Sequence, residues 1–417
     1  MTNGTTPAAR LLFVIDNDFG ALGTILYLLY RQPISTRATL LLPPRAYEMH
    51  EGRLPMASRP YRSLQDILDV VESESPDVVC LVSGYLFASS GLLTINALRK
   101  LVRTLRERGC KVATTDPYFG TFREIAKADL PARHGAIHRF VERYLVKLPA
   151  VYGLAARVVK FYNRKKLERD VYRVADILKD VTHFDPVRID PLDAGVRRIP
   201  FFNPLYVRTE EELRANSAVV SALPDVSQGR PRWLFVLAKF DLEFQEKKYG
   251  KQGFVDIVVA KIRETIDNGR HATFIGPAGV TEALLTRFPG DTRVSLLPYC
   301  SFDEFERRLL DAEIAFYWQI FSTSAFLRLW NGLPVFFFDP GHNAHLLSSL
   351  HETGLKYFYL AGPPIYLDVE RPLDATALIQ PGIDFRQSAR DIFERLARLP
   401  TPADMVNALR DTARRAP

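Results

Sequence analysis

The segment from Val294 to Gly341 constrains the fold more than any other part of the chain. It alternates strand-like apolar runs with amphipathic, helix-like stretches, and its last run, Leu333 to Phe338, is apolar throughout. A strand without polar alternation is covered on both faces, as strands are in the parallel sheets of α/β proteins. This segment therefore predicts a parallel sheet with helices on both sides.

The same alternation runs through two long parts of the chain, separated by an irregular region. Strands that alternate with helices form βαβ units, which build parallel sheets. In the first part, strands are predicted at 11–15, 38–42, 78–82 and 111–115, with helices at 22–30, 64–72 and 92–108. In the second part, strands are predicted at 233–238, 272–275, 294–297, 312–318 and 333–338, with helices at 254–268, 280–288, 302–311 and 325–331.

A chain of 417 residues is too long for one hydrophobic core, because single cores rarely exceed about 250–300 residues. We predict an N-terminal domain over residues 1–200, which includes a basic, aromatic, helical excursion at 132–198. A C-terminal domain over 210–390 and a helical tail over 391–417 follow. Ligands of doubly wound sheets bind beyond the carboxyl ends of the strands. The predicted fold class is α/β, with two Rossmann-like doubly wound domains that face a cleft.

The cysteines indicate the compartment. The chain has three, far apart and without Cys-x-x-Cys or Cys/His spacing, so we expect neither a disulfide framework nor structural zinc, and we expect the cytoplasm. The apolar run near the N-terminus carries Asp16 and Asp18, unlike a secretory signal. No window is apolar for long enough to predict a membrane span.

The net charge of +7 indicates either an anionic partner, such as nucleic acid, a membrane surface or an anionic substrate, or simply basic residues spread over the surface. The basic residues are spread out rather than clustered among aromatic residues, so nucleic acid is not the expected partner. The segment His138 to Arg173 does combine basic residues with an apolar stripe at helical spacing. It is either a helix lying on the inner face of a membrane or a buried helix, and burial is the favoured interpretation.

A hydroxyl-rich turn in the second half predicts a phosphate site. Ser322, Thr323 and Ser324 stand between a buried strand and a helix, where free backbone N–H groups and the positive end of the helix dipole favour an anion. Lys239, predicted at the end of the first strand of this half, could neutralise a diphosphate leaving group. The plain alternative for the hydroxyl turn is an N-capped helix without a ligand.

A base could lie beside the phosphates, against Leu297, Pro298 and Tyr299 at the end of the strand predicted at 294–297. The backbone of these residues would then contact the edge of the base. The second half contains neither Asp-x-Asp nor His-Glu-x-x-His, so we predict no metal site, and we predict no cofactor.

The turn after the first strand carries two carboxylates and two glycines. Gly20 and Gly23 allow a tight turn and the close approach of a ligand, although the spacing of these glycines is not that of a dinucleotide-binding fingerprint. Asp18, or less favourably Asp16, could act as general base toward an acceptor, with Asn17 and Gly20 in contact with it. The alternative role for either aspartate is an N-cap.

Two further strand ends are candidates for binding the acceptor. Ser83 and Tyr85 follow the third predicted strand, and Asp116 follows the fourth. Small polar residues and Asp-Pro pairs are also ordinary turn formers. The sequence leaves both interpretations open.

These residues resemble those of known families. Leu297-Pro298-Tyr299, Phe302 to Phe305, Ser322 to Ser324 and Gly332 to Val335 resemble the donor-binding domain of GT-B glycosyltransferases. Asp16 to Gly23 is similar to the first turn of the protein-arginine rhamnosyltransferases that act on elongation factor P. In that family, strand-end aspartates serve as candidate base and acceptor contacts.

The chain also departs from these families. It inserts Asp18 before Phe19 and has Ala21 where the rhamnosyltransferases have aspartate. Many GT-B enzymes hold the donor ribose with a glutamate on the helix after the hydroxyl turn, where this chain offers Arg328 and Asn331.

The resemblance implies a glycosyltransferase that moves a sugar from a nucleotide-diphosphate donor without a metal. The acceptor (a glycan, a lipid-linked group or a protein) is not identified by the sequence. An aspartate base would make the enzyme inverting, and without it a retaining mechanism remains open. Two alternatives remain: a nucleotide-sugar 2-epimerase, for which His342 and His345 are candidates, and a non-catalytic GT-B-like protein that binds a nucleotide or a partner.

Overall fold

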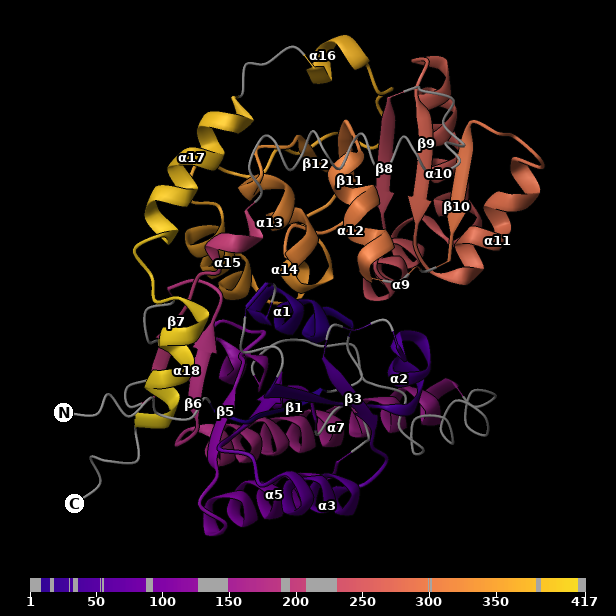
Figure 1. Cartoon of the computed structure of the whole chain (residues 1–417). Coiled ribbons are helices and arrows are strands. Elements are labelled where there is room, and N and C mark those ends of the chain that lie inside the picture. Colours follow the sequence, from indigo (N-terminus) through magenta and orange to yellow (C-terminus); the bar gives the residue numbers. More distant parts are fainter. Residues whose placement is uncertain are drawn as a thin grey trace, which may run out of the picture.

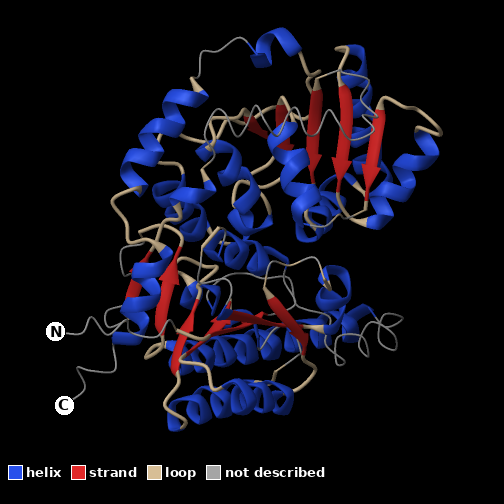
Figure 2. Ribbon diagram, viewed as in Figure 1, coloured by secondary structure: helices blue, strands red, loops and turns tan. Residues whose placement is uncertain are grey.

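The structure is a computed structural model. It describes residues 9–15, 19–29, 31–32, 37–52, 54, 56–87, 93–126, 149–188, 196–207, 231–298, 300, 302–379 and 384–411. Two parallel sheets, each with helices on both sides, form two domains that lie one above the other in Figure 1. Figure 2 shows the same layers coloured by type of element.

The first sheet has seven parallel strands in the order β3-β2-β1-β4-β5-β6-β7. The strands are β1 (Leu11–Ile15), β2 (Ala38–Leu42), β3 (Ala57–Pro60), β4 (Val78–Val82), β5 (Lys111–Thr114), β6 (Thr182–Asp185) and β7 (Arg198–Pro200). The helices of this domain are α1 (Phe19–Leu29), α2 (Pro44–His50), α3 (Leu64–Glu74), α5 (Ile95–Glu107) and α7 (Pro149–Leu178), with the short 3₁₀ helices η2 (Gly84–Leu86), η3 (Phe122–Ala126) and η4 (Pro204–Tyr206).

The second sheet has five parallel strands in the order β10-β9-β8-β11-β12. The strands are β8 (Arg232–Val236), β9 (His271–Ile275), β10 (Val294–Leu297), β11 (Ile314–Tyr317) and β12 (Val335–Phe337). The helices are α9 (Lys239–Tyr249), α10 (Lys251–Asp267), α11 (Ala278–Arg287), α12 (Phe302–Asp311), α13 (Thr323–Trp330), α14 (His342–Leu346), α15 (Ser348–Phe358), α16 (Ala375–Ile379), α17 (Phe385–Leu396) and α18 (Pro402–Asp411).

Apolar side chains explain the layers. Alternate residues of β1 point to opposite faces, so Phe13 joins a core with α1 and α2 while Val14 joins a core with α3, α5 and α7. In the second sheet, Phe316 packs with α10 and α11, and Tyr317 packs with α12, α13 and α15. Strands buried on both faces need continuous apolar runs, which is why these strands could be predicted from the sequence.

The two domains meet where the carboxyl ends of their strands point toward each other, as the arrowheads in Figure 1 show. The ring centroids of Tyr27 on α1 and Trp330 on α13 are 5.3 Å apart. Phe119, which follows β5, lies 4.8 Å from Phe358 on α15, again between ring centroids. After α17, which packs on α13, helix α18 contacts β5 and β7 of the first sheet. The predicted α/β fold of two doubly wound domains is confirmed.

Several elements differ from those predicted. The irregular region includes β6 and β7, which extend the first sheet, and β3 was also missed. The strand predicted at 233–238 ends at Val236, so Lys239 is the first residue of α9 rather than the end of a strand. Among the helices that the structure describes, none combines the length and the apolar composition that crossing a membrane requires.

Candidate functional site

Each sheet has one point where the order of its strands reverses. In the second sheet the chain adds β9 and β10 on one side of β8, and then β11 and β12 on the other. The reversal lies between β8 and β11, and in the first sheet it lies between β1 and β4. Such switch points open a crevice beyond the carboxyl ends of the strands, where ligands of α/β sheets bind.

Two helices begin at the switch point of the second sheet. Helix α9 follows β8 and starts at Lys239, whereas α13 follows β11 and starts at Thr323. The side chains of the N-cap residues, Ala238 and Ser322, accept no capping hydrogen bond from the backbone N–H groups of the first turn. The free N–H groups and the positive dipole ends of both helices therefore lie at one edge of the sheet, which favours an anion there.

Three hydroxyl groups next to the start of α13 form a chain of hydrogen bonds. The Tyr317 hydroxyl donates to Oγ of Ser324 at 3.0 Å, and the Oγ atoms of Ser324 and Ser322 are 2.8 Å apart. Burial raises the pKa of Tyr317, so this phenol keeps its proton at neutral pH. When the Ser324 hydroxyl donates its hydrogen bond to Oγ of Ser322, the hydroxyl hydrogen of the partly exposed Ser322 is left to donate to a ligand.

Lys239 is exposed and occupies the first position of α9. A cation at the N-terminus of a helix is unfavourable, because it faces the positive end of the dipole. Asp241 in the same turn offsets part of this repulsion, and a bound anion would offset the rest. The predicted role of Lys239 as a phosphate ligand remains a prediction.

The predicted base-contacting residues are only partly described. Leu297 ends β10 at the edge of the second sheet and is partly buried. Its carbonyl accepts a hydrogen bond from the N–H of Gly276 at 3.2 Å, so this group already has a partner inside the sheet. Tyr299 lies outside the described residues.

A pair of histidine–carboxylate contacts lies beside these helix starts. The Nδ1 atom of His342 lies 2.8 Å from Oδ1 of Asp241, and the His342 backbone N–H donates to the same oxygen at 3.0 Å. One turn later, Nε2 of His345 lies 2.9 Å from Oδ1 of Asp339. Both carboxylates are buried, so α14 is tied to the start of α9 and to the end of β12.

Gly341 allows this arrangement. Its φ of +93° is in the left-handed region, and a Cβ atom there would lie 2.5 Å from Cβ of Gln319 and 3.2 Å from Oδ1 of Asp241. Only glycine fits so close an approach. The loop after β12 thereby passes over the end of β11 and places His342 at the switch point.

The switch point of the first sheet is described in part. Asp16, Asn17 and Asp18 lie outside the described residues, and Gly20 is in the first turn of α1. Ser83 follows β4 with a φ of +54°, unusual for a serine, and is buried. Strained residues of this kind concentrate at functional sites, which is compatible with the predicted acceptor role of Ser83 without testing it.

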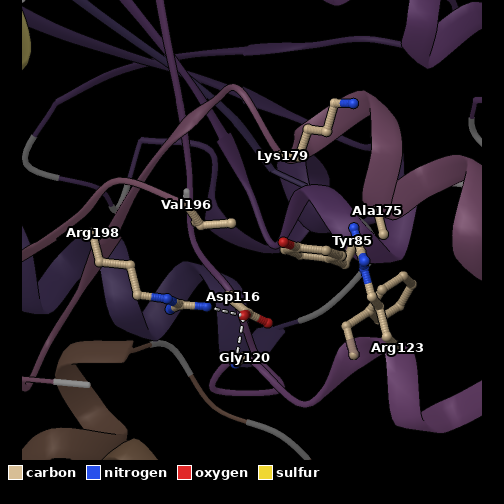
Figure 3. A pocket seen from close by; sticks show the side chains of 9 residues that line it. Tyr85, Asp116, Gly120, Arg123, Ala175, Lys179, Val196 and Arg198 are labelled. Carbon is tan, nitrogen blue, oxygen red and sulfur yellow. Dashed lines mark hydrogen bonds and ion pairs between the residues drawn. The ribbon is translucent and has the colours of Figure 1, made fainter. Parts of the chain in front are cut away.

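Tyr85 and Asp116 take part in contacts inside the first domain. The Tyr85 hydroxyl donates to Nε2 of His183 at 2.7 Å, since Nδ1 of His183 faces a carbonyl. The Asp116 carboxylate accepts from the N–H groups of Tyr118 and Gly120 and from Arg198. Figure 3 shows Tyr85, Asp116 and Arg198 among the residues around a small cavity of about 10 Å³, which suits one water. An acceptor contact by either residue stays a prediction.

A buried guanidinium between two carboxylates holds this region together. Arg198 contacts both oxygens of Asp185 at 3.1 and 3.0 Å and Oδ2 of Asp116 at 2.6 Å. The side chains of Asp116 and Asp185 are 1% and 2% exposed, respectively. Burial raises the pKa of the Asp185 carboxyl to about 7, against the opposing effect of Arg198 and with a further rise from Asp116.

The stability of the protein is therefore expected to depend on pH through Asp185. The folded state holds the proton more tightly than the unfolded chain, in which an aspartate has a pKa of about 3.9. The resulting contribution is full below about pH 4 and is lost as the pH rises through about 7. Between about pH 4 and 7, the melting temperature of Asp185→Asn should fall less steeply with rising pH than that of the native protein. An unchanged slope would contradict this assignment.

Some contacts could not have been found from the sequence. Arg328, on the helix where many GT-B enzymes have a ribose-binding glutamate, is fully buried, and its acceptors in the described part of the chain are backbone carbonyls of the second domain. Asn331 donates to the carbonyl of Leu327 and closes α13. The contact of His342 with Asp241 carried no sequence signal, because these residues are 101 positions apart.

No known family model matches the sequence, and no curated protein matches it. Solved structures resemble it over nearly the whole chain. UDP-glucose:anthocyanidin 3-O-glucosyltransferase, in complex with UDP, gives a TM-score of 0.50 at 7% identity over 98% of this chain and 99% of that one. A variant of the wall teichoic acid polymerase TagF gives 0.51 at 12% identity over 98% and 90%.

A third resemblance is weaker. UDP-GlcNAc 2-epimerase from Methanocaldococcus jannaschii gives a TM-score of 0.44 at 13% identity, over 97% of this chain and 99% of that one. At identities this low a structural likeness establishes the architecture alone. The two stronger likenesses show that this chain has the two-domain GT-B fold.

Proposed function

We propose that the protein transfers a sugar from a nucleotide-diphosphate donor, without a metal, to an acceptor bound by the first domain. The observation that carries the proposal is the meeting of α9 and α13 at the switch point of the second sheet. Two uncapped helix starts, Lys239 and the hydroxyl chain of Ser322 and Ser324 together provide donors for a diphosphate. The names of the two stronger structural neighbours, a glucosyltransferase with UDP and a polymerase, are compatible with this chemistry.

The proposed reaction uses one base and one anion site. The acceptor oxygen attacks C1 of the sugar, and Asp18 or Asp16 takes its proton. The bond between C1 and the diphosphate oxygen breaks, and the negative charge that develops on the diphosphate is stabilised by Lys239, by Ser322 to Ser324 and by the N–H groups of α13. Attack from the side opposite the leaving group makes this reaction inverting.

A second candidate is a nucleotide-sugar 2-epimerase. It would require histidine and carboxylate groups next to the sugar, and the structure brings His342 together with Asp241, and His345 with Asp339, near the proposed donor site. An epimerase would interconvert two nucleotide sugars without an acceptor. Incubation with a nucleotide sugar alone, followed by nuclear magnetic resonance of the sugar, separates the two activities.

Donor binding can be tested by thermal unfolding with UDP, dTDP, GDP, ADP and CMP, with and without EDTA. A ligand at about 100 times its Kd should stabilise the protein by roughly 2.7 kcal/mol. We expect selective stabilisation by one diphosphate, unaffected by EDTA. Lys239→Ala should weaken binding about 10- to 100-fold, because a charged hydrogen bond contributes about 1.5–3 kcal/mol. Ser324→Ala should weaken it less.

Lys251 provides the matched control. It is also an exposed lysine at the first position of a helix, but it does not follow a strand. Lys251→Ala should leave nucleotide binding unchanged. Equal losses in both lysine variants, or no stabilisation by any nucleotide, would contradict the proposed donor site. Stabilisation without transfer or epimerisation would favour a non-catalytic nucleotide-binding protein.

Contact with the inner face of a membrane through residues 138–173 remains a further proposal. Helix α7 includes the second part of this segment, and Arg164, Lys165, Lys166 and Arg169 are exposed on it. Basic side chains of this kind favour an anionic surface. Sedimentation with vesicles that contain an anionic lipid, compared with neutral vesicles, tests this contact.

A further inference from the structure

The His342–Asp241 pair has the geometry of an oriented imidazole. A carboxylate only accepts hydrogen bonds, so the 2.8 Å contact places the proton of the ring on Nδ1 of His342. Asp241 is fully buried, whereas the His342 side chain is 19% exposed. The ring is also held by Phe240, whose centroid is 5.4 Å away. Orientation of one ring nitrogen by a buried carboxylate leaves the other, Nε2, for a ligand.

The position of this pair matches that of the proposed donor site. Asp241 lies in the first turn of α9, two residues after Lys239. The loop that carries His342 crosses the end of β11, where Gln319 is pressed against Gly341, and β11 leads into Ser322 and α13. His342 therefore lies over the same switch point as the two helix starts.

Asp241 shows a further feature that packing alone does not explain. Its second oxygen, Oδ2, is buried and has no hydrogen-bond partner in the described part of the structure, and the same is true of Nε2 of Gln245 one turn later. Burying a carboxylate without satisfying it is costly. A residue that only tied α14 to α9 would not need a charge there, whereas a residue that stabilises a protonated histidine would.

We propose that His342, oriented by Asp241, binds the diphosphate of the donor through Nε2–H in its protonated form. This inference rests on the proposed function and adds a binding residue to it. Asp241 acts as a positioning residue, since it contacts the histidine and not the ligand. The elements that hold the ring also carry other charged groups, which include Lys239 and Lys248 on α9 and Asp339 and His345 in the β12–α14 region.

The test measures affinity for the nucleotide sugar of the diphosphate selected in the unfolding experiments, by calorimetry between about pH 6 and 8.5. A nucleotide sugar is the better probe, because the terminal phosphate of a free diphosphate itself titrates near pH 6. Affinity of the native protein should fall as the pH rises, since histidines lose their charge in this range. His342→Asn should bind about 10- to 100-fold more weakly at pH 6 and show no dependence on pH.

His271→Asn is the control, because His271 is the first residue of β9 and so lies at the amino end of the strand, on the edge of the sheet opposite the proposed donor site. It should retain the affinity and its pH dependence. A purely structural role for His342 would lower the melting temperature of the unliganded variant and leave affinity unchanged, which would overturn the inference while the donor site stands. Equal affinity of the native protein across the pH range would also overturn it. Absence of binding to the native protein at every pH would overturn the proposed function together with this inference.

Discussion

Replacing Arg328 by methionine is expected to lower the free energy of unfolding by about 4 kcal/mol or more, and so to unfold the second domain near physiological temperature. Arg328 is fully buried and has no carboxylate partner in the described structure. Its guanidinium instead donates to the carbonyls of Leu309, Ala312, Glu313 and Pro334. Each carbonyl left without a donor costs about 1–3 kcal/mol.

The carbonyls explain why a buried cation is tolerated. Leu309 and Ala312 lie at the carboxyl end of α12, where the helix dipole is negative and a cation is stabilised. Burial lowers the pKa of Arg328 to about 10, so the side chain stays charged at neutral pH. The arginine thereby joins α12, α13, β11 and β12 at the end of the sheet opposite the proposed donor site.

Urea unfolding of the purified variants checks this prediction. Arg328→Lys keeps the charge but loses the fork of donors, so it should recover only part of the loss. Arg390→Met is the control, because Arg390 is exposed on α17 and should change stability by less than about 0.5 kcal/mol. A stability of Arg328→Met equal to that of the control would show that the carbonyl contacts do not hold the domain.

The second large effect is expected in the first domain. Arg198→Met would leave Asp116 and Asp185 buried with no cation between them. Breaking a buried ion pair by removing one partner typically costs about 3–5 kcal/mol, because the remaining charge is uncompensated. Strand β7 would also lose its tie to β6, since Arg198 and Asp185 come from these two strands.

The neighbouring residue serves as the control for Arg198. Arg197 is exposed and, among the described residues, its side chain donates to the carbonyl of Ala408 at 3.4 Å, so Arg197→Met should cost far less in the same urea unfolding experiment. Adding Asp185→Asn to Arg198→Met should restore part of the stability, because an asparagine is neutral and avoids the cost of either charging or protonating a buried carboxyl that has lost its cation. A double variant less stable than Arg198→Met would contradict this explanation.

Much of the fold could be predicted because the signal is local. Strands β1, β2, β4 and β10 have the predicted bounds, since buried parallel strands require unbroken apolar runs. Helix α9 was missed because its sequence, Lys239 to Tyr249, has charged residues on every side. Strands β6 and β7 were missed because they are short and lie at the edge of the sheet, where pairing with a neighbour rather than pattern defines them.

The residues of the candidate site also fall into those with a local sequence signal and those without one. Ser322 to Ser324 could be found because hydroxyl residues before a helix follow a local rule. The contacts of His342 with Asp241, and of Arg198 with Asp116, join residues 101 and 82 positions apart, and no spacing in one sequence reveals them. The buried role of Arg328 was hidden for the same reason, since its acceptors are backbone groups that any residue provides.

The most direct test of the donor site is a crystal structure with the nucleoside diphosphate that stabilises the protein most. The diphosphate should lie between the starts of α9 and α13, within hydrogen-bond distance of Ser322 or of the first N–H groups of α13. Lys239 and His342 should face it. A diphosphate bound instead at the first sheet, or away from both switch points, would contradict the proposed donor site.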